Sequence, residues 1–348
     1  KEGHLIASDQ FMLQRKKPYN NIHNYSDIES SQFKKSLSKN VSDSEITFER
    51  NNDGIIISAS DVKYQFNFDQ GQLLKVFLKD KEFVSSPIIH NVWRAPTDND
   101  KGGSFGDSFN SRWIKAGYNN LKRTVGSVNY KKLNGKAVKV IVEEKYSNNN
   151  SEIDVLMNYV IYDNGDLRLE IETNINPILS VLPKIGLTTK LPSHFSEISW
   201  YGRGPFETYP DRKLGSLIGL YNKNIEKLYH PYIRPQENGN HTDTRWVSIG
   251  DDNNRGIIIW GEEYFNFSAH RYTLDNLTKS THTNEIKNSK YVNLNIDHKM
   301  MGVGGDDSWN PRTHNEFLIK PKDYKYSYIF RFSNNLKNAI KRPLPLNY

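Results

Sequence analysis

Apolar and polar side chains alternate with a period of two in many short stretches of this chain. Residues 62–68 read Val-Lys-Tyr-Gln-Phe-Asn-Phe, so every second side chain is aliphatic or aromatic. This pattern is typical of a β-strand with one buried face. Residues 69–72 supply a turn before Leu73, and the two flanks are therefore predicted to form an antiparallel hairpin.

A second hairpin is predicted between residues 155 and 172. Its first flank runs to Tyr162, and its second places Leu167, Leu169 and Ile171 on one face with charged residues between them. The connecting turn holds an Asn-Gly pair at positions 164 and 165, which favours the positive φ values that tight hairpin turns require.

The same alternation returns in residues 138–142, 257–260, 292–296 and 324–332. The pattern indicates no long amphipathic helix. Many short strands separated by Gly, Asn and Asp favour antiparallel sheets in a sandwich or barrel over alternating β-α-β units. The sequence therefore predicts an all-β fold.

Composition narrows the class of protein further. With 348 residues, the chain can bury one large core or two ordinary ones. It has no cysteine, which excludes disulfides, thiolate metal sites and cysteine nucleophiles. The mean hydropathy is −0.73 and no apolar run reaches the ~18 residues of a membrane-spanning helix, so we expect no membrane partner. The formal charge is +7, but lysines are scattered among acids, which argues against nucleic acid as a partner.

The first 45 residues differ from the rest. Residues 14–45 are polar and turn-forming with almost no apolar periodicity, and we interpret them as a linker before a folded domain over residues 46–348. The chain begins at Lys1 without Met, and no charged segment followed by an apolar one is visible as a secretion signal. It therefore reads as an internal piece of a longer chain.

Four segments interrupt the strand pattern and are dense in Trp, Gly, Pro, Asp and Asn. They are residues 93–102, 200–212, 232–241 and 301–311. Sugars are bound by exposed aromatic faces together with carboxylates and amides, and all four segments hold those residue types. Trp309 lies in a polar, tightly turning stretch, which favours an exposed ring, although a core tryptophan is the alternative. Trp93, Trp200 and Trp260 adjoin apolar strand residues and are predicted to be core.

Glycoside hydrolysis needs two carboxyl groups across the scissile bond. The candidates in these segments are Glu207, Asp211, Glu237, Asp306 and Asp307. Each also has a structural interpretation, which we favour. Glu207 and Asp211 are placed to pair with Arg212, and Glu237 to hold backbone N–H groups of its own turn. Asp306 and Asp307 are turn-capping residues by type. The histidines show no metal-ligand spacing, so no metal site is expected.

Taken together, the segments resemble the C-terminal region of bacterial β-galactosidases of glycoside hydrolase family 2, called the small chain. The resemblance covers roughly residues 48–335. It rests on residues 93–96 followed by 98–100, on Gly204-Pro205 with Glu207 and residues 209–212, on residues 237–239, and on residues 301–309. Residues 2–7 resemble the last strand of the immunoglobulin-like domain that precedes the small chain, which makes residues 1–13 a remnant of that domain.

The resemblance implies a single large antiparallel super-sandwich related to galactose mutarotase. It also implies that the catalytic glutamates, and the ligands of Mg²⁺ and Na⁺, lie in an upstream (β/α)8 barrel outside this chain. None of the carboxylates named above matches those glutamates. The expected partners are a barrel-bearing remainder or large subunit and the galactoside, in an oligomeric enzyme of the bacterial cytoplasm or periplasm.

Two features carry over from the family. Trp309 matches the tryptophan that reaches the active site of the barrel and stacks on the sugar and aglycone. The residues Asp98, Asn99, Asp100, Lys101, Gly102 and Gly103 match the start of a loop near that site. Thr97, Lys101 and residues 103–106 depart from the better-known family pattern.

We therefore expect a domain without catalytic residues that completes the active site of a retaining β-galactosidase. Two alternatives remain. One is a stand-alone carbohydrate-binding module that uses the same Trp309 face. The other is a sugar epimerase of mutarotase type, which would need a histidine and a carboxylate facing one sugar oxygen.

Overall fold

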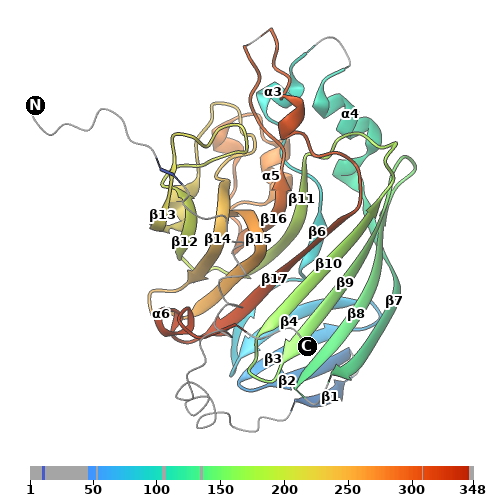
Figure 1. Ribbon diagram of the computed structural model, residues 1–348, viewed down its shortest axis with the longest axis vertical. Coiled ribbons are helices and arrows are strands. Elements are labelled where there is room, and N and C mark those ends of the chain that lie inside the picture. Colours follow the sequence, from blue (N-terminus) through green and yellow to red (C-terminus); the bar gives the residue numbers. More distant parts are fainter. Residues whose placement is uncertain are drawn as a thin grey trace, which may run out of the picture.

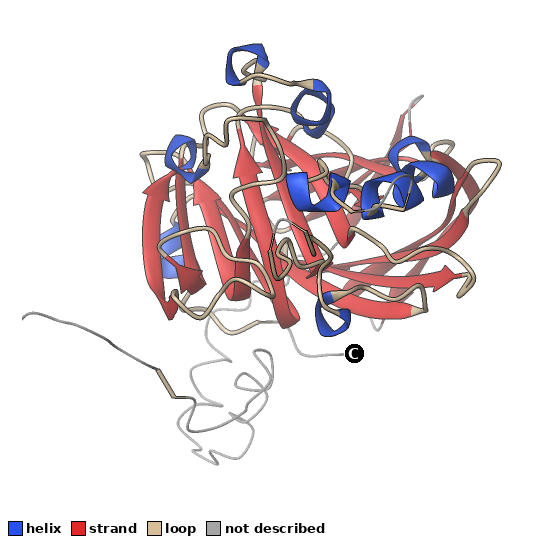
Figure 2. Ribbon diagram, turned by 90° about the horizontal axis from the view of Figure 1, so that it is seen from above, coloured by secondary structure: helices blue, strands red, loops and turns tan. Residues whose placement is uncertain are grey.

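The computed structural model describes residues 10–11, 46–51, 54–103, 107–133, 136–307 and 309–344. These residues form seventeen strands in two sheets with a few short helices between them (Figures 1 and 2). Every strand pairing in this part of the chain is antiparallel. The predicted all-β antiparallel fold is confirmed.

The smaller sheet is a meander of five strands in chain order. Its strands are β1 (Thr47–Asn51), β2 (Gly54–Ala59), β3 (Val62–Asn67), β4 (Gln72–Leu78) and β5 (Lys81–Val84). The hairpin predicted around residues 69–72 is the β3–β4 pair. The period-two pattern that predicts β3 appears as alternate burial, with Val62, Tyr64 and Phe66 facing the core.

The larger sheet holds the other twelve described strands. They are β6 (Ile89–Asn91), β7 (Lys122–Leu133), β8 (Ala137–Ser147), β9 (Glu152–Tyr162), β10 (Leu167–Ile175), β11 (Lys184–Pro192), β12 (Glu197–Gly204), β13 (Leu217–Asn224), β14 (His241–Gly250), β15 (Gly256–His270), β16 (Tyr291–Met300) and β17 (Tyr324–Ser333). The order across the sheet is β13-β12-β14-β15-β17-β10-β9-β8-β7.

The sheet forks at β15, which has fifteen residues. Residues 256–261 of β15 pair with β17, whereas residues 266–270 pair with β16. β16 continues the second branch to β11 and then β6. β15 therefore belongs to both branches of the sheet, the branch through β17 and the branch through β16 (Figure 1).

The second predicted hairpin is β9–β10. In its turn only Gly165, at φ +80°, is left-handed, so the Asn-Gly pair uses one positive φ rather than two. A Cβ at position 165 would lie 2.8 Å from Val62 Cγ2, and Tyr64 Oη donates a hydrogen bond to the Gly165 carbonyl at 2.8 Å. Glycine is needed there because the turn packs against the smaller sheet.

The remaining predicted strands lie within β8, β15, β16 and β17. The helices are short: α3 (Asp98–Lys101), α4 (Phe109–Ala116), α5 (Leu274–Lys279) and α6 (Leu336–Ala339), with 3₁₀ turns η2 (Tyr118–Asn120), η3 (Ile225–Leu228), η4 (Thr283–Glu285) and η5 (Asn315–Phe317). Among the described residues, no helix has the length and apolar character needed to cross a membrane.

One hydrophobic core joins the two sheets. Phe332 of β17 packs edge-on against Tyr64 and Phe83 of the smaller sheet, with ring centroids 5.9 and 6.3 Å apart. Trp93, Trp200 and Trp260 are buried, as predicted. The expected remnant strand at residues 1–13, apart from Gln10 and Phe11, and the expected linker at residues 14–45 lie outside the described residues, so those boundaries stay predictions.

Candidate functional site

The structure brings the four loop segments together at one end of the sandwich, near α3 (Figure 1). The 93–102 and 232–241 segments meet where Gln236 Oε1 accepts from the Asp98 N–H at 3.0 Å and Glu237 N–H donates to the Ala95 carbonyl at 3.1 Å. Arg94 connects the 93–102 segment to the 301–311 segment, and Glu207 connects the 200–212 segment to the 232–241 segment. Asp211 connects the 200–212 segment to the 301–311 segment. These four segments span more than 200 positions of the sequence, yet they contact one another in the fold.

Arg94 lies at the centre of this cluster and is fully buried. Its Nε and Nη2 donate to both carboxylate oxygens of Asp100 at 3.1 and 2.7 Å. Nη1 and Nη2 also donate to the carbonyls of Met301 and Gly302 at 2.6 and 2.8 Å. One guanidinium thus ties the 93–102 segment to the start of the 301–311 segment, and four of its five N–H donors have protein acceptors.

The residues expected to form an active-site loop divide into an inner and an outer set. Asp100 is buried, and its carboxylate also accepts from the Thr97 N–H at 2.8 Å while Thr97 Oγ1 accepts from the Asp100 N–H, a capping box that begins α3. Asp98 and Gly103 are exposed, whereas Asn99, Lys101 and Gly102 are half-buried. Asp100 is therefore a structural residue, and the outer set faces solvent.

Trp309 is 90% exposed at the tip of the 301–311 segment, as its polar, turning sequence predicts. Asp307 Oδ1 accepts from the N–H groups of Trp309 and Asn310, each at 2.8 Å, and these bonds lower the pKa of Asp307. His314 Nε2 lies 2.6 Å from Asp306 Oδ1. Asp307 therefore has the predicted turn-capping role, whereas the Asp306 carboxylate pairs with the side chain of His314 instead of capping backbone N–H groups.

Glu207 makes the predicted ion pair with Arg212. Its carboxylate also accepts from the Tyr232 hydroxyl and from the Gly239 N–H, the latter at 2.7 Å. The pair is only partly enclosed, since the side chain of Arg212 is 49% exposed. Glu207 therefore holds the 232–241 segment against the 200–212 segment.

Asp211 does not pair with Arg212, contrary to the expectation from their adjacency. Its carboxylate accepts from the backbone N–H groups of Val303 and Gly304 at 2.8 and 2.7 Å. Residues 209–212 form a tight turn in which Tyr209 and Arg212 exchange backbone hydrogen bonds. Neighbouring side chains leave this turn in different directions, and Asp211 is directed to the base of the Trp309 loop.

Glu237 also differs from its expected role. The Gly239 N–H, in the same turn, donates to Glu207 rather than to Glu237. Among the described residues, the Glu237 carboxylate accepts no hydrogen bond. The side chain is buried, and burial raises the pKa of Glu237 to about 7, although Lys184 and Arg94 oppose this effect. Glu237 is a buried acid beneath the loops.

A further brace links two segments that the sequence offers no way to pair. Arg312 Nη2 donates to the Asp107 carbonyl at 3.0 Å and forms an ion pair with its carboxylate, which also pairs with Arg112. A Cβ at Gly102 would lie 2.8 Å from Pro311 Cγ, so the two loops also touch here. The loop that begins at Asp98 and the Trp309 loop are therefore in contact at two places.

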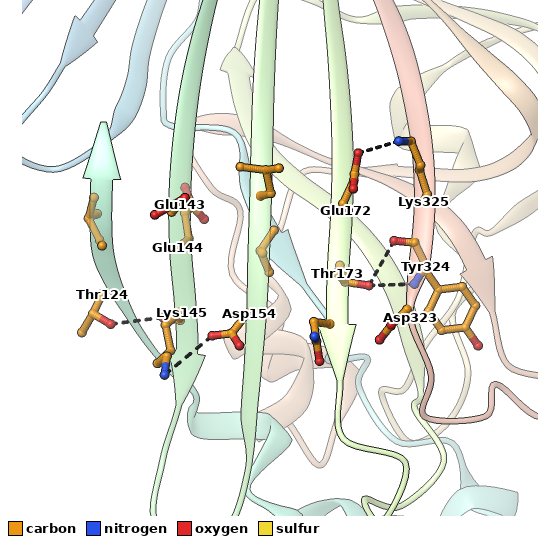
Figure 3. A pocket seen from close by; sticks show the side chains of 15 residues that line it. Thr124, Glu143, Glu144, Lys145, Asp154, Glu172, Thr173, Asp323, Tyr324 and Lys325 are labelled. Atoms are coloured by element: carbon orange, nitrogen blue, oxygen red, sulfur yellow. Dashed lines mark hydrogen bonds and ion pairs between the residues drawn. The ribbon is translucent and has the colours of Figure 1, made fainter. Parts of the chain in front are cut away.

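Figure 3 shows the side chains that line a hollow elsewhere, on the outer face of β7 to β10 and β17. The volume of this hollow is about 700 Å³. Its charged side chains are paired across strands, for example Lys325 with Glu172 at 2.6 Å and Lys145 with Asp154 at 3.7 Å. Among the described residues that line it, Tyr324 is the one aromatic side chain, and it is itself buried. The hollow does not present the exposed aromatic face that a sugar platform needs, and Trp309 remains the candidate.

Chemically, the loop cluster presents an exposed indole on a braced loop. Four of the five candidate carboxylates are engaged in holding the loops, and Glu237 is enclosed. In the described part of the chain, no three His, Asp or Glu side chains are grouped to hold a metal ion.

The described chain is thus an antiparallel β-sandwich domain that carries an exposed tryptophan on a braced loop. More particularly, the chain belongs to the beta galactosidase small chain family, whose model matches residues 58–330. It is 34% identical over 331 residues to a beta-galactosidase of Pseudoalteromonas haloplanktis and 31% identical over 335 residues to one of Vibrio cholerae. These alignments cover 93% and 94% of this chain but only 30% of each relative.

Among solved structures, the chain is similar to a galactose mutarotase-like protein from Clostridium acetobutylicum, with a TM-score of 0.44, 12% identity, and coverage of 83% of this chain and 99% of that one. It is also similar to galactose 1-epimerase from Lactobacillus acidophilus, with a TM-score of 0.42, 10% identity, and coverage of 83% and 99%.

Proposed function

We propose that this chain is the C-terminal domain or small subunit of a retaining β-galactosidase and that it completes an active site whose catalytic carboxylates lie elsewhere. The observation that carries the proposal is Trp309, whose ring is 90% exposed on a loop held at its base by Asp211 and Arg94. An exposed indole has no stabilising role in the domain itself, because it buries almost no apolar surface there.

The bracing of the loop suits a platform for a sugar. The face of the indole packs against C–H groups of a galactoside or its aglycone, and the loop has to hold the ring in place before the ligand arrives. Asp307 fixes the backbone at Trp309, and Arg312 fixes the far side of the loop through Asp107. A platform that is already ordered loses little conformational entropy when it binds.

In this proposal the partner of the chain is the barrel-bearing remainder of the enzyme. This fits the finding that the chain covers only 30% of the length of its relative. It contributes the acid/base and the nucleophile. This chain contributes binding and the shape of the site. Galactoside binding by the chain alone is then weak, because one wall of a site captures only part of the ligand surface.

The test uses Trp309→Ala in a complex reconstituted from this chain and the part of the Pseudoalteromonas haloplanktis enzyme that the chain does not match. We expect the isolated chain to be inactive on a chromogenic β-galactoside and the complex to be active. In the complex, Trp309→Ala should raise KM about ten- to a hundredfold, the rough scale of one large apolar contact, with a smaller change in kcat.

The matched control is Ile178→Ala, which removes another highly exposed apolar side chain, in the turn between β10 and β11. It should leave KM unchanged. Hydrolysis by the isolated chain, or an unchanged KM for Trp309→Ala in an active complex, would refute the proposal.

A further inference from the structure

The strand β13 forms an edge of the larger sheet, where β12 is its one partner among the described strands (Figure 1). None of its eight residues is buried, whereas β12 alternates between buried and less buried positions along its length. An edge strand of this kind carries a row of unpaired N–H and C=O groups, which is a template for another strand.

The edge lacks the usual protection. Residues 217–222 of β13 carry no charge and no proline, and the first charged side chain is Lys223. Leu220 is 73% exposed, and it lies opposite Tyr201 of β12 on the outer face of the sheet. The segment that joins β12 to β13 adds Phe206 and Leu214, both strongly exposed. We call Ile218, Leu220 and Tyr201 the β13 edge surface.

One described residue from the start of the chain already uses this edge. Gln10 Nε2 donates to the Ile218 carbonyl at 3.0 Å, and the Ile218 N–H donates to Gln10 Oε1 at 2.7 Å. The side-chain amide of Gln10 thus imitates the pairing that a neighbouring strand would make.

The two hydrogen bonds between Ile218 and Gln10 show which way the backbone groups of β13 point. Ile218 directs both backbone groups away from β12, and in an antiparallel ladder this arrangement repeats every second residue. Leu220 and Asn222 therefore present their N–H and C=O groups to the same side as Ile218. The edge offers three successive pairs, and in the described part of the chain Gln10 engages the first.

We propose that the β13 edge surface docks the remainder of a β-galactosidase, which adds a strand alongside β13 and covers Leu220 and Tyr201. This inference rests on the proposed function, because it takes the partner to be the rest of that enzyme. The contact of Gln10 favours this occupant, since a residue from the start of the chain already lies against β13. The relatives supply further chain, of which the present one covers only 30%.

A second copy of this chain is the less favoured occupant. Pairing two β13 edges would displace Gln10 from Ile218 in both copies and lose both hydrogen bonds in each. The remainder of the enzyme can extend the pairing that Gln10 begins without breaking it.

The experiment measures binding of the full 348-residue chain to the unmatched part of the Pseudoalteromonas haloplanktis enzyme. Leu220→Glu places a charge on the proposed contact and should weaken binding about ten- to a hundredfold. The control Ile178→Glu places the same charge at another exposed position and should bind normally. Hydrogen exchange at the amides of Leu220 and Asn222 should slow in the complex, and the melting temperature of both variants should match that of the wild type.

The outcomes separate this inference from the proposed function. Normal binding by Leu220→Glu, together with a raised KM for Trp309→Ala, overturns the docking site and leaves the proposed function standing. Weakened binding by Leu220→Glu in a complex without hydrolytic activity supports the docking site and counts against the proposed function. Absence of binding by the wild type, or a dimer of this chain that Leu220→Glu dissociates, overturns the docking site.

Discussion

The interior beneath the loops and the loop tip hold the same kinds of residues in opposite environments. Beneath the loops, Arg94 and Asp100 form a pair with almost no exposed surface, and Glu237 is buried beside them. At the tip and rim, Trp309 is 90% exposed and Arg212 is half-exposed in its pair with Glu207. Residue type alone therefore does not decide between support and recognition; burial and satisfied hydrogen bonds do. Substitutions in the interior should change stability, and those at the tip should change binding.

A large loss of stability is expected for Arg94→Met. The substitution leaves the Asp100 carboxylate buried without its cation and leaves two carbonyls without donors, which should lower the free energy of unfolding by about 3–5 kcal/mol. Urea denaturation measures this loss. Arg112→Met, which breaks an exposed pair with Asp107, is the control and should change stability by less than about 1 kcal/mol.

The double variant Arg94→Met/Asp100→Asn sharpens this test, because it removes both charges. It should be more stable than Arg94→Met alone. Equal stability of the single and double variants would show that the buried charge is not the cause of the loss.

Glu237 should make stability depend on pH. Its pKa is raised to about 7 in the folded chain from an ordinary 4.5, so folding favours the protonated form. The stabilisation is complete below about pH 4.5 and is lost as pH rises to about 7, by something like 3 kcal/mol in all. Glu237→Gln keeps the shape of the side chain without titrating. Unfolding at pH 5 and pH 8 should therefore show a smaller difference for the variant than for the wild type; the same difference in both would place the pH dependence elsewhere.

A smaller effect is expected for Arg212→Ala. Because Arg212 is half-exposed and Glu207 keeps its bonds from Tyr232 and Gly239, the loss should be about 1 kcal/mol. Thermal melting measures it. A loss as large as that of Arg94→Met would remove the contrast between the rim and the interior.

The smallest change of stability is expected for Trp309→Ala, which should melt within about 1 °C of the wild type because the ring buries little surface. Trp200→Ala is the matched comparison. Trp200 is fully buried, and its loss should lower stability by about 3–5 kcal/mol. A large drop in melting temperature for Trp309→Ala would make Trp309 a structural residue.

The features that could be predicted from sequence are the local ones. Both hairpins follow from alternation around a turn, the exposure of Trp309 follows from its polar neighbours, and the Glu207–Arg212 pair follows from a spacing of five residues. The partner of Asp211 lies 92 positions away and that of Arg312 lies 205 positions away. No pattern in a single sequence pairs such residues, because their approach is set by the order of strands across the sheet. The strand β13 is not among those that alternation predicts, and its edge position is hidden for the same reason, because the order of strands across the sheet sets it.

The place of β17 in the sheet has a consequence for synthesis. β17 is the last described strand, yet it lies between β10 and β15 and pairs with both. A ribosome releases these two strands long before residues 324–333, so the incomplete chain holds two open edges that β17 alone closes among the described strands. Native pairing therefore waits for these late residues, and folding is slowed by contacts between distant parts of the chain. Truncation before Tyr324 opens the middle of the sheet rather than trimming its end.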